Sequence, residues 1–380
     1  MAILTVNSGS SSLKVSLFLQ SERINAHFKN LSSDTPTLEI NKKEIPFSKR
    51  FTIKEALIHI LDTLEIKKYP LIGVGHRFVH GSSVFTESTP LSDEVINKLE
   101  TLLELAPLHN PACLEAIKAS KDYFRNELLQ IAVFDTAFHS HMLPVASTYA
   151  INKAFGIKRF GFHGIAHAFS YEQYQKHRGN GKKVITIHLG AGCSMAAIKD
   201  GISLDTSMGF TPCEGLVMAT RSGDLDPALA NYLCVSQKLS LQQVTDLFNT
   251  SSGLLGLSGI SGDMKTLLTL YDKNDDAKLA VDLFCYRIQK YLGAYLTVLE
   301  GADAIIFSGG IGENSPPIRS RIIEKMNWLG IALDSLQNEK ITHSMHKISA
   351  AKSSVEVFVV ASDENCYIKE EVCRLGNLYT

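Results

Sequence analysis

Three turns rich in Gly and Ser follow apolar runs that are typical of β-strands. They comprise residues 7–12 (NSGSSS), 190–194 (GAGCS) and 309–314 (GGIGEN). Glycine lets a ligand approach the backbone, and successive backbone N–H groups in such turns form binding sites for anions. The third turn leads into a helix, whose N-terminus favours phosphate. Together the three turns predict a site for a phosphorylated ligand.

The two best-known phosphate-binding fingerprints are absent from the sequence. Residues 178–183 (RGNGKK) lack the first Gly and the final Ser or Thr of a Walker A loop. The stretch GGIGEN does not fit the G-x-G-x-x-G pattern of dinucleotide-binding folds. Nucleotide binding would therefore use the hairpin-and-cleft arrangement of the actin-like ATPases.

Two arginines lie in mostly apolar surroundings, and a buried guanidinium needs an anionic partner. For Arg77 and Arg221 that partner is either Asp135, which ends an apolar run, or an anionic substrate. Asp363 and Glu364 end a second apolar run, and such carboxylates suit Mg²⁺. This set of residues, without a nucleophile–base pair, favours phosphoryl transfer. An acceptor that is already an anion, a carboxylate or a phosphate, would need no general base.

Histidine and cysteine leave a weaker alternative open. His163 and His167 have i, i+4 spacing, but the sequence has no H-E-x-x-H motif and no cysteine near this pair, so a His-dependent metallohydrolase is the weaker hypothesis. The seven cysteines are scattered without a C-x-x-C pair, which indicates free thiols in a reducing cytoplasm.

Length and composition exclude several classes of protein. A chain of 380 residues predicts two domains, and 45% hydrophobic residues suffice for a sizeable core. The net charge of −1, without a long basic run, argues against a nucleic-acid partner. We find no signal peptide and no apolar run long enough to cross a membrane, so we expect a cytoplasmic protein without a membrane partner.

The elements that must position these residues alternate between strand and helix, which is typical of the α/β class. Strands are expected over 2–7, 13–19, 71–80 and 128–135, and a strand–turn–strand unit over 183–201. Helices are expected over 54–66 and 276–300 and at the C-terminus. Further helices are expected to begin after the N-caps Ser92 and Asp226, the latter with Pro227 at the first helical position. Another is expected to begin at the capping box of Ser240 and Gln243.

Each half of the chain begins with a strand–turn–strand unit built around small residues, which suggests two related domains facing a cleft. We expect the first domain to comprise residues 1–150 and the second 151–363. The C-terminal helix, 364–380, is expected to pack back on the first domain, and the active site to lie in the cleft.

Nearly the whole chain resembles the acetate/propionate kinase (acetokinase) family. The matching motifs, in the family's order, are VNSGSSSLK, HRFVHG, LAPLHNP, VFDTAFH, GFHGIAH, HLGAGCS, LDTSMGFTPCEGLVMATRSGDLDP, SGLLGLSGISGDM, GGIGENS and SDEN. The resemblance implies the two-domain actin-like ATPase fold of the acetate and sugar kinase, heat-shock 70 and actin superfamily, with a mixed sheet and flanking helices in each domain. It also implies a homodimer that transfers the ATP γ-phosphoryl reversibly and in line to acetate, giving acetyl phosphate and ADP, with Mg²⁺ or, in its place, Mn²⁺.

The resemblance also carries residue roles, position by position. The catalytic residues it implies are Arg77, Asp135, His163 and Arg221, with His109 and His167 nearby, and the metal pair is Asn7 and Glu364. The acyl group would lie against Arg77, Val79, Leu108, Phe162 and Pro212. The nucleotide would contact Ser10, Ser12, Lys14, His188, Leu189, Gly190, Ala191, Gly192, Asp263, Met264, Lys265, Gly310, Ile311, Gly312, Glu313 and Asn314.

The chain departs from the family pattern mainly around the nucleotide. Ala191 stands where the family usually has Asn, and Lys265 where Arg is common. These changes leave the choice of phosphoryl donor open. Two alternatives to an acetate kinase remain on the same fold: a kinase for propionate or another short acid, and a nucleotide-binding module without catalysis.

Overall fold

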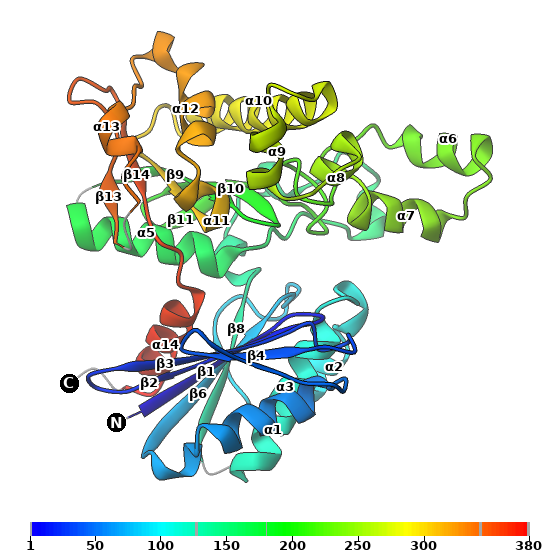
Figure 1. Ribbon diagram of the computed structural model, residues 1–380, viewed down its shortest axis with the longest axis vertical. Helices are drawn as coiled ribbons and strands as arrows, with labels where there is room; N and C mark the ends of the chain where they lie inside the picture. Colours follow the sequence, from blue (N-terminus) through cyan, green and yellow to red (C-terminus); the bar gives the residue numbers. More distant parts are fainter. Residues whose placement is uncertain (1, 126–127, 180, 342–343, 378–380) are drawn as a thin grey trace. The chain divides into compact units, whose positions relative to one another are not determined.

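The computed structural model describes residues 2–125, 128–179, 181–341 and 344–377 and divides the chain into two compact units (Figure 1). The first unit comprises Met1–Phe138 and Asp363–Thr380, and the second comprises His139–Ser362. The division thus falls after Phe138 instead of after residue 150. The reason is local, because His139 hydrogen-bonds to Ser203 and to the carbonyl of Phe162, both in the second unit.

The first unit is built on a mixed sheet that has eight strands among the described residues, in the order β5-β4-β3-β2-β1-β6-β8-β7. β1 pairs with β2 in an antiparallel hairpin and with β6 in parallel, and β6 pairs with β8 in parallel. The strands are β1 (Ala2–Ser8), β2 (Leu13–Phe18), β3 (Arg23–Lys29), β4 (Thr37–Ile40), β5 (Lys43–Pro46), β6 (Leu71–Phe78), β7 (Thr89–Pro90) and β8 (Leu129–Phe134).

Helices cover this sheet and bury its apolar side chains. The helices are α1 (Ile53–Thr63), α2 (Asp93–Glu100), α3 (Asn110–Phe124) and α14 (Glu364–Leu375). α1 packs on β2 and on α3, and the core there includes Val15, Leu57 and Ile60. α14 packs on β1 and β6, so the C-terminal helix belongs to the first unit.

The second unit holds a sheet that has six strands in the described part of the chain, in the order β11-β10-β9-β12-β14-β13. β9 pairs with β10 in an antiparallel hairpin and with β12 in parallel, which repeats the arrangement of β1, β2 and β6. The strands are β9 (Lys183–Leu189), β10 (Cys193–Lys199), β11 (Ile202–Thr206), β12 (Ala304–Ser308), β13 (His346–Lys347) and β14 (Glu356–Val359).

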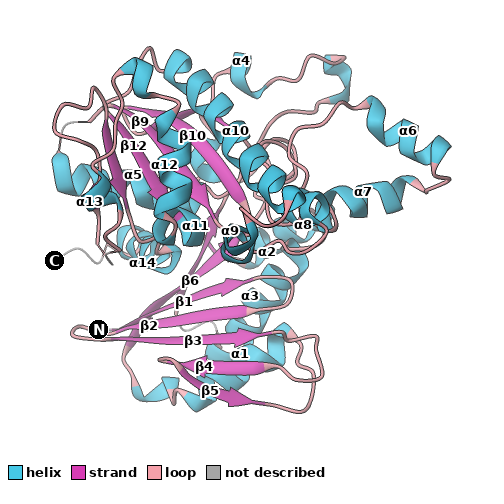
Figure 2. Ribbon diagram, turned by 45° about the horizontal axis from the view of Figure 1, so that its top comes forward, coloured by secondary structure: helices cyan, strands magenta, loops and turns pink. Residues whose placement is uncertain are grey.

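Helices lie on both faces of the second sheet, with α5 on β9 and α10 along β9, β10 and β11 (Figures 1 and 2). The helices of this unit are α4 (Pro144–Ser147), α5 (Gly164–Arg178), α6 (Ala228–Ser236), α7 (Leu241–Thr250), α8 (Gly253–Ser258), α9 (Met264–Leu270), α10 (Asp275–Val298), α11 (Gly309–Asn314), α12 (Pro316–Glu324) and α13 (Ser335–Asn338). The capping box of Ser240 and Gln243 and the N-cap at Ser92 are confirmed. α6 begins at Ala228, one residue later than expected, but Pro227 is already in helical conformation and the side chain of Asp226 accepts a hydrogen bond from the N–H of Ala228 at 2.8 Å, as the predicted cap would.

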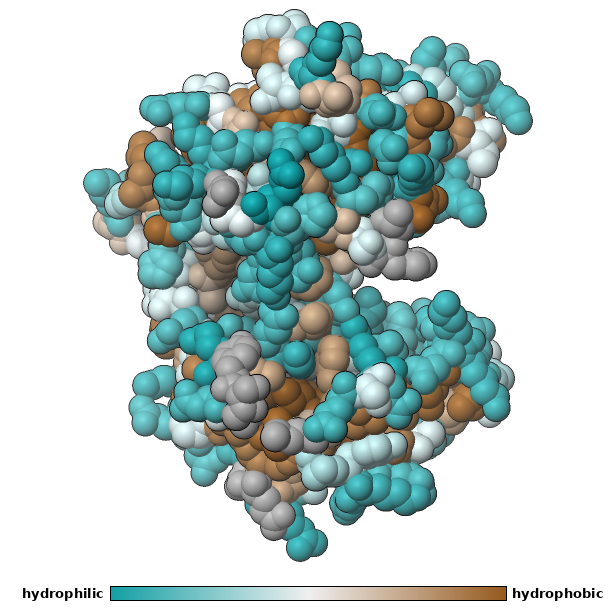
Figure 3. Space-filling view, turned by 90° about the vertical axis from the view of Figure 1, so that its left-hand side faces the viewer, coloured by the Kyte–Doolittle hydropathy of each residue, from teal (hydrophilic) through white to brown (hydrophobic). Residues whose placement is uncertain are grey.

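The surface of the second unit is mostly hydrophilic on the face that Figure 3 shows. Among the residues that the structure describes, no helix is both long enough and apolar enough to cross a membrane.

Candidate active site

In the first unit, the parallel pairing of β6 with β8 brings Arg77 beside Asp135. Arg77 lies near the end of β6, and Asp135 directly follows β8. The guanidinium donates from Nη2 to Oδ2 of Asp135 at 2.6 Å, and from Nε to both carboxylate oxygens at 3.1 and 3.2 Å. The Asp135 side chain is fully buried and that of Arg77 is 18% exposed. The structure thus pairs Arg77 with Asp135 and leaves one end of the guanidinium for other contacts.

Neighbouring carboxylates keep the guanidinium of Arg77 charged. Burial works against the charge of Arg77, but the carboxylates of Asp135 and Glu364 outweigh it and raise the pKa of Arg77. Burial also raises the pKa of Asp135, and the Arg77 guanidinium opposes that rise. A permanently charged guanidinium of fixed orientation suits the recognition of a carboxylate or a phosphoryl group.

Asn7 and Glu364, predicted to be the metal pair, continue the same network. Nη1 of Arg77 donates to Oδ1 of Asn7 at 3.1 Å, and Nδ2 of Asn7 donates to Oε2 of Glu364 at 2.8 Å. Asn7 lies on β1, and Glu364 is the first residue of α14. We call Asn7, Arg77, Asp135 and Glu364 the first half-site.

The donor chemistry of the first half-site fits Mg²⁺. Mg²⁺ is usually bound by one or two carboxylates, several waters and the phosphates of the substrate. Glu364 would supply the carboxylate, and the carboxamide of Asn7 lies beside it. No group of three or more His, Cys, Asp or Glu residues that could hold a metal occurs within the described ranges.

The turn between β1 and β2 projects polar groups. It closes with a hydrogen bond from the N–H of Gly9 to the carbonyl of Ser12 at 2.8 Å. Ser10 is exposed and Ser12 half-buried, while Lys14 is exposed on β2 opposite Asn7. The turn therefore presents its hydroxyl groups and the Lys14 ammonium on the strand pair that carries Asn7.

In the second unit, His163 and Arg221 converge on the turn between β9 and β10. A Cβ atom built on Gly192 would lie 3.1 Å from Nε2 of His163 and 3.5 Å from Nη1 of Arg221. The absent side chain of Gly192 is what lets the imidazole and the guanidinium approach the same point. We call His163, Gly192 and Arg221 the second half-site.

His163 is held in an unusual backbone conformation. Its φ of 56° is left-handed, and it directly precedes α5. Such a conformation is unfavourable for a residue with a side chain and persists where the surrounding structure fixes it, often at functional sites. Nδ1 of His163 bonds to Oγ of Ser194 at 2.9 Å, and its ring lies 5.0 Å from that of His188. The ring is thereby fixed relative to Gly192.

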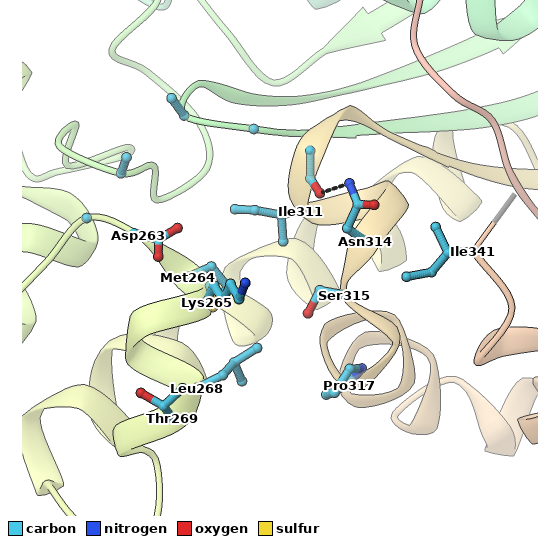
Figure 4. Close-up of a pocket in the computed structure, with 15 residues that line it drawn as sticks. Asp263, Met264, Lys265, Leu268, Thr269, Ile311, Asn314, Ser315, Pro317 and Ile341 are labelled. Atoms are coloured by element: carbon cyan, nitrogen blue, oxygen red, sulfur yellow. Dashed lines mark hydrogen bonds between the residues drawn. The ribbon is translucent and has the colours of Figure 1, made fainter. Parts of the chain in front are cut away.

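A pocket of about 980 Å³ opens beside the second half-site, lined from β9–β10, α9 and α11 (Figure 4). This volume is within the range of small-molecule sites. The predicted nucleotide residues that line it are Gly190, Ala191, Asp263, Met264, Lys265, Gly310, Ile311 and Asn314. Those of the second unit that do not are Leu189, which is buried in the core, and His188, Gly192, Gly312 and Glu313; the predicted residues of the first unit, Ser10, Ser12 and Lys14, do not line it either.

The glycine that begins α11 is required by the backbone. Gly309 has a φ of 78°, and a Cβ there would lie 2.6 Å from the carbonyl oxygen of Leu189. Arg319 holds the last turn of α11, because its Nη1 donates to the carbonyls of Gly312 and Glu313 at 2.7 and 2.9 Å. Arg319 is fully buried, and the sequence does not indicate its role, because most of its partners are backbone carbonyls and the side-chain partner, Asn338, lies 19 residues away.

Other contributors to the site were also missed by the sequence analysis. The pocket includes the apolar residues Leu268, Pro317 and Ile341, which in the sequence look like ordinary helix or loop positions. Ser194, which anchors His163, was noticed only as a member of the small-residue turn.

The four apolar residues of the predicted acyl pocket are divided between the two units. Val79 and Leu108 belong to the first unit, and Phe162 and Pro212 to the second. Val79 and Phe162 are buried, whereas Leu108 is 61% exposed. His109, at the N-cap of α3, is likewise in the first unit, and His163 and His167 are in the second. The acyl pocket therefore stays a prediction.

Two mixed sheets with flanking helices, each containing an antiparallel hairpin that pairs in parallel with a third strand, are typical of phosphotransferases with the actin-like ATPase fold. The acetokinase family model matches residues 2–370, and the chain belongs to this family. The predicted class of enzyme, a kinase of the acetate kinase type, is thereby confirmed, as is the fold class.

Relatives and solved structures agree with this assignment. The acetate kinase of Solibacter usitatus is 45% identical over 310 residues, covering 79% of this chain and 75% of that protein. The acetate kinase of Brachyspira hyodysenteriae is 38% identical over 396 residues, covering 99% and 100%. The crystal structure of Porphyromonas gingivalis acetate kinase aligns with a TM-score of 0.91 at 35% identity, covering 98% and 99%. A propionate kinase from Francisella tularensis aligns with a TM-score of 0.90 at 35% identity, covering 97% and 98%.

Proposed function

We propose that this enzyme transfers the γ-phosphoryl group of ATP reversibly to acetate, giving acetyl phosphate and ADP. The observation that carries the proposal is the convergence of His163 and Arg221 on Gly192, next to the pocket. A guanidinium and an imidazole N–H there suit the charge that spreads over a phosphoryl group in flight. Membership of the acetokinase family supports acetate as the acceptor.

In this proposal the first half-site binds the acceptor. Arg77 holds the acetate carboxylate or the incoming phosphoryl group, and Asp135 fixes the direction of the guanidinium through the hydrogen bonds at Nε and Nη2. Acetate is already ionised at neutral pH, so its oxygen attacks phosphorus directly and in line without a general base.

The second half-site and its pocket bind the nucleotide in this proposal. The pocket takes the nucleoside between the α9 segment Asp263–Lys265 and the α11 segment Gly310–Asn314. The phosphates lie toward the glycine turn that contains Gly192. In the first unit, Ser10, Ser12 and Lys14 of the β1–β2 turn stay the predicted donors to phosphate. Ala191, without an amide side chain, leaves the phosphate contacts of its turn to backbone N–H groups.

Asn7 and Glu364 would hold Mg²⁺, for which Mn²⁺ substitutes. When bound, the ion neutralises phosphate oxygens and orients the γ-phosphoryl group. The hydrogen bond between the two side chains, at 2.8 Å, supports a joint role, because it fixes the Glu364 carboxylate relative to β1.

The proposal is tested by trapping the acyl phosphate. Purified protein with ATP, MgCl₂ and acetate should form acetyl hydroxamate in the presence of hydroxylamine, and omission of ATP or addition of excess EDTA should abolish the signal. Absence of hydroxamate with acetate, propionate and butyrate alike would overturn the proposal. Calorimetric binding of ADP under those conditions would then favour a nucleotide-binding module without catalysis.

Propionate is the second candidate acceptor, because a solved relative of nearly the same fold is named a propionate kinase. One methylene group in an apolar pocket changes specificity by about 1–3 kcal/mol. The ratio of kcat/KM for two-, three- and four-carbon acids decides between the candidates, and the acid with the highest value is the acceptor to which the pocket is fitted.

We further propose that the enzyme is a homodimer in the cytoplasm. Helix α6 supports this, because none of its residues is buried although it is rich in apolar side chains: Leu229, Tyr232 and Val235 are 40%, 63% and 72% exposed. A second copy of the chain that covers this helix would remove the apolar surface from water. Light scattering on the eluting protein should give twice the chain mass of 41.8 kDa, and a monomer mass would contradict the proposal.

A further inference from the structure

Behind His163 lies a chain of buried hydrogen bonds that the proposed reaction does not use directly. Oγ of Ser194 lies 2.9 Å from Nδ1 of His163 and 2.7 Å from Nε2 of His167. Nδ1 of His167 lies in turn 2.8 Å from Oγ1 of Thr186. This chain of hydrogen bonds therefore joins α5, β10 and β9, and its members follow in the order His163, Ser194, His167, Thr186.

The interior residues of this chain of hydrogen bonds are buried, and the imidazole of His167 is neutral. His167, Ser194 and Thr186 all have no exposed surface. Burial lowers the pKa of His167 well below its usual value, and His139 and His188 nearby lower it further. A neutral imidazole carries one N–H and one bare nitrogen, so at His167 one ring nitrogen donates and the other accepts.

Only one placement of the hydrogen atoms along this chain of hydrogen bonds gives every buried donor an acceptor. Among the residues that the structure describes, the hydroxyl of Thr186 has Nδ1 of His167 as its hydrogen-bond partner and no other. If Nδ1 carried the proton, the Thr186 hydroxyl hydrogen would be buried without an acceptor, which is unfavourable. The Thr186 hydroxyl therefore donates to Nδ1, and His167 carries its proton on Nε2.

The same count then fixes the other end of the chain. Nε2–H of His167 donates to Oγ of Ser194, so the single Ser194 hydroxyl hydrogen is available for His163. It donates to Nδ1 of His163, and that nitrogen is therefore bare. The remaining His163 proton must lie on Nε2, the nitrogen that faces Gly192 and Arg221.

We propose that Thr186, His167 and Ser194 are positioning residues that fix the tautomer of His163 with its proton on Nε2. This inference rests on the proposed role of His163 toward the phosphoryl group. An N–H donor at Nε2 attracts a negatively charged phosphoryl oxygen, whereas a bare Nε2 would repel it. The chain thus sets in advance, in the free enzyme, the hydrogen bond that the reaction needs, as partners of active-site histidines do elsewhere.

The tautomer can be measured without any reaction. In protein labelled with ¹⁵N-histidine, the His163 signals, identified by their loss in His163→Asn, should show a protonated Nε2 and an unprotonated Nδ1 at pH 7.5. Ser194→Ala should shift both signals toward a mixture of tautomers, because Nδ1 loses its donor. A protonated Nδ1 in the unmodified enzyme, or an unchanged His163 spectrum in Ser194→Ala, overturns the proposal.

Activity provides the second readout. Ser194→Ala should lower kcat by about 10- to 100-fold, the usual loss when a partner that orients an active-site histidine is removed, while the KM for ATP stays within about twofold. Thr186→Val, which keeps the shape and removes the hydroxyl, should lower kcat in the same direction by a smaller factor. Wild-type kcat in both variants overturns the proposal.

Ser203→Ala is the matched control. Ser203 is equally buried, and its Oγ lies 2.8 Å from Nδ1 of another histidine, His139, outside this chain of hydrogen bonds. It should leave kcat and the His163 spectrum unchanged; a loss equal to that of Ser194→Ala would show that any buried hydroxyl in this sheet has the same effect, and would overturn the proposal. If the unmodified protein forms no acyl hydroxamate, the proposed function fails. The tautomer measurement still decides whether these hydrogen bonds fix the proton of His163 on Nε2.

Discussion

At the scale of single residues, Asp135 has the most constrained role. Its carboxylate accepts three hydrogen bonds from Arg77, and its side chain is fully buried. An ionised acetate offers no proton for a base to remove. In the proposed reaction the carboxylate would therefore act on Arg77 and not on the substrate. It binds Nε and Nη2 and so directs the remaining nitrogen, Nη1, to Asn7.

Asp135→Asn tests this role, because it keeps the size of the side chain and removes the charge. The KM for acetate should rise and kcat should fall by about tenfold or more, since Arg77 loses its fixed orientation. Stability should fall by about 3 kcal/mol, because a buried guanidinium is left without a counter-charge. Measured steady-state kinetics and urea unfolding check both. The pH profile of kcat should keep its shape.

Loss of the acidic limb of that profile would contradict the orienting role, because it would identify Asp135 as a general base. The control is Glu94→Gln, which breaks an exposed ion pair with Lys98 on α2. Exposed pairs contribute little to stability, so this variant should match the unmodified enzyme in both assays.

At the scale of elements, the contact between β6 and α14 is decisive for the first half-site, because these elements carry Arg77 and Glu364. It depends on glycine. A Cβ on Gly75 would lie 2.4 Å from Cγ2 of Ile368 and 2.9 Å from Cγ2 of Val372. The helix can lie this close to the strand only because Gly75 has no side chain.

Two identical substitutions should therefore have opposite effects. Gly75→Ala should destabilise the protein by about 1–3 kcal/mol by overpacking, and should raise the Mg²⁺ concentration needed for half-maximal activity because α14 carries Glu364. Gly293→Ala lies on α10, where an added Cβ would have no described atom within 4 Å apart from its chain neighbours and the backbone of its own helix. It should stabilise by about 0.5–1 kcal/mol through helix propensity. Thermal unfolding with and without Mg²⁺ checks both; a stabilising Gly75→Ala would contradict the close packing.

The elements that sequence predicts well are those specified within a few residues. The capping box at Ser240 and the N-cap at Ser92 are local hydrogen bonds, and both were predicted. The contact of Ser194 with His163 joins residues 31 positions apart and depends on where α5 lies over the sheet. The resemblance identified His163, but no local pattern indicated which side chain holds its ring.

The buried Arg319 is a second residue whose contacts the sequence does not predict. In the sequence it is one basic residue on a helix with no acidic partner nearby, which is typical of a solvated surface. In the structure Nε of Arg319 donates to Oδ1 of Asn338 at 2.8 Å and its other donors bond backbone carbonyls. Such partners depend on the meeting of α11, α12 and α13, and no composition or spacing rule reports that meeting.

At the scale of the whole molecule, both units bury histidines. His76 is in the first unit and His139 in the second, each 1% exposed. Burial lowers the pKa of each to about 4 from the usual 6.5. Between these values the unfolded chain binds a proton at each position that the native protein does not. The free energy of unfolding must therefore fall as the pH falls from 6.5 toward 4, and must be insensitive to these groups above 6.5.

For His76 alone, the loss between pH 7.5 and pH 5 should be about 2 kcal/mol, since one pKa unit corresponds to about 1.4 kcal/mol. Urea unfolding at the two pH values, with a probe in the first unit, measures the difference. In His76→Gln, which retains a polar group near Gln130, the difference should shrink by that amount. His141→Gln, at an exposed position, should leave it unchanged. If His76→Gln keeps the full pH dependence, His76 is protonated in the folded protein and the linkage between its burial and acid stability does not hold.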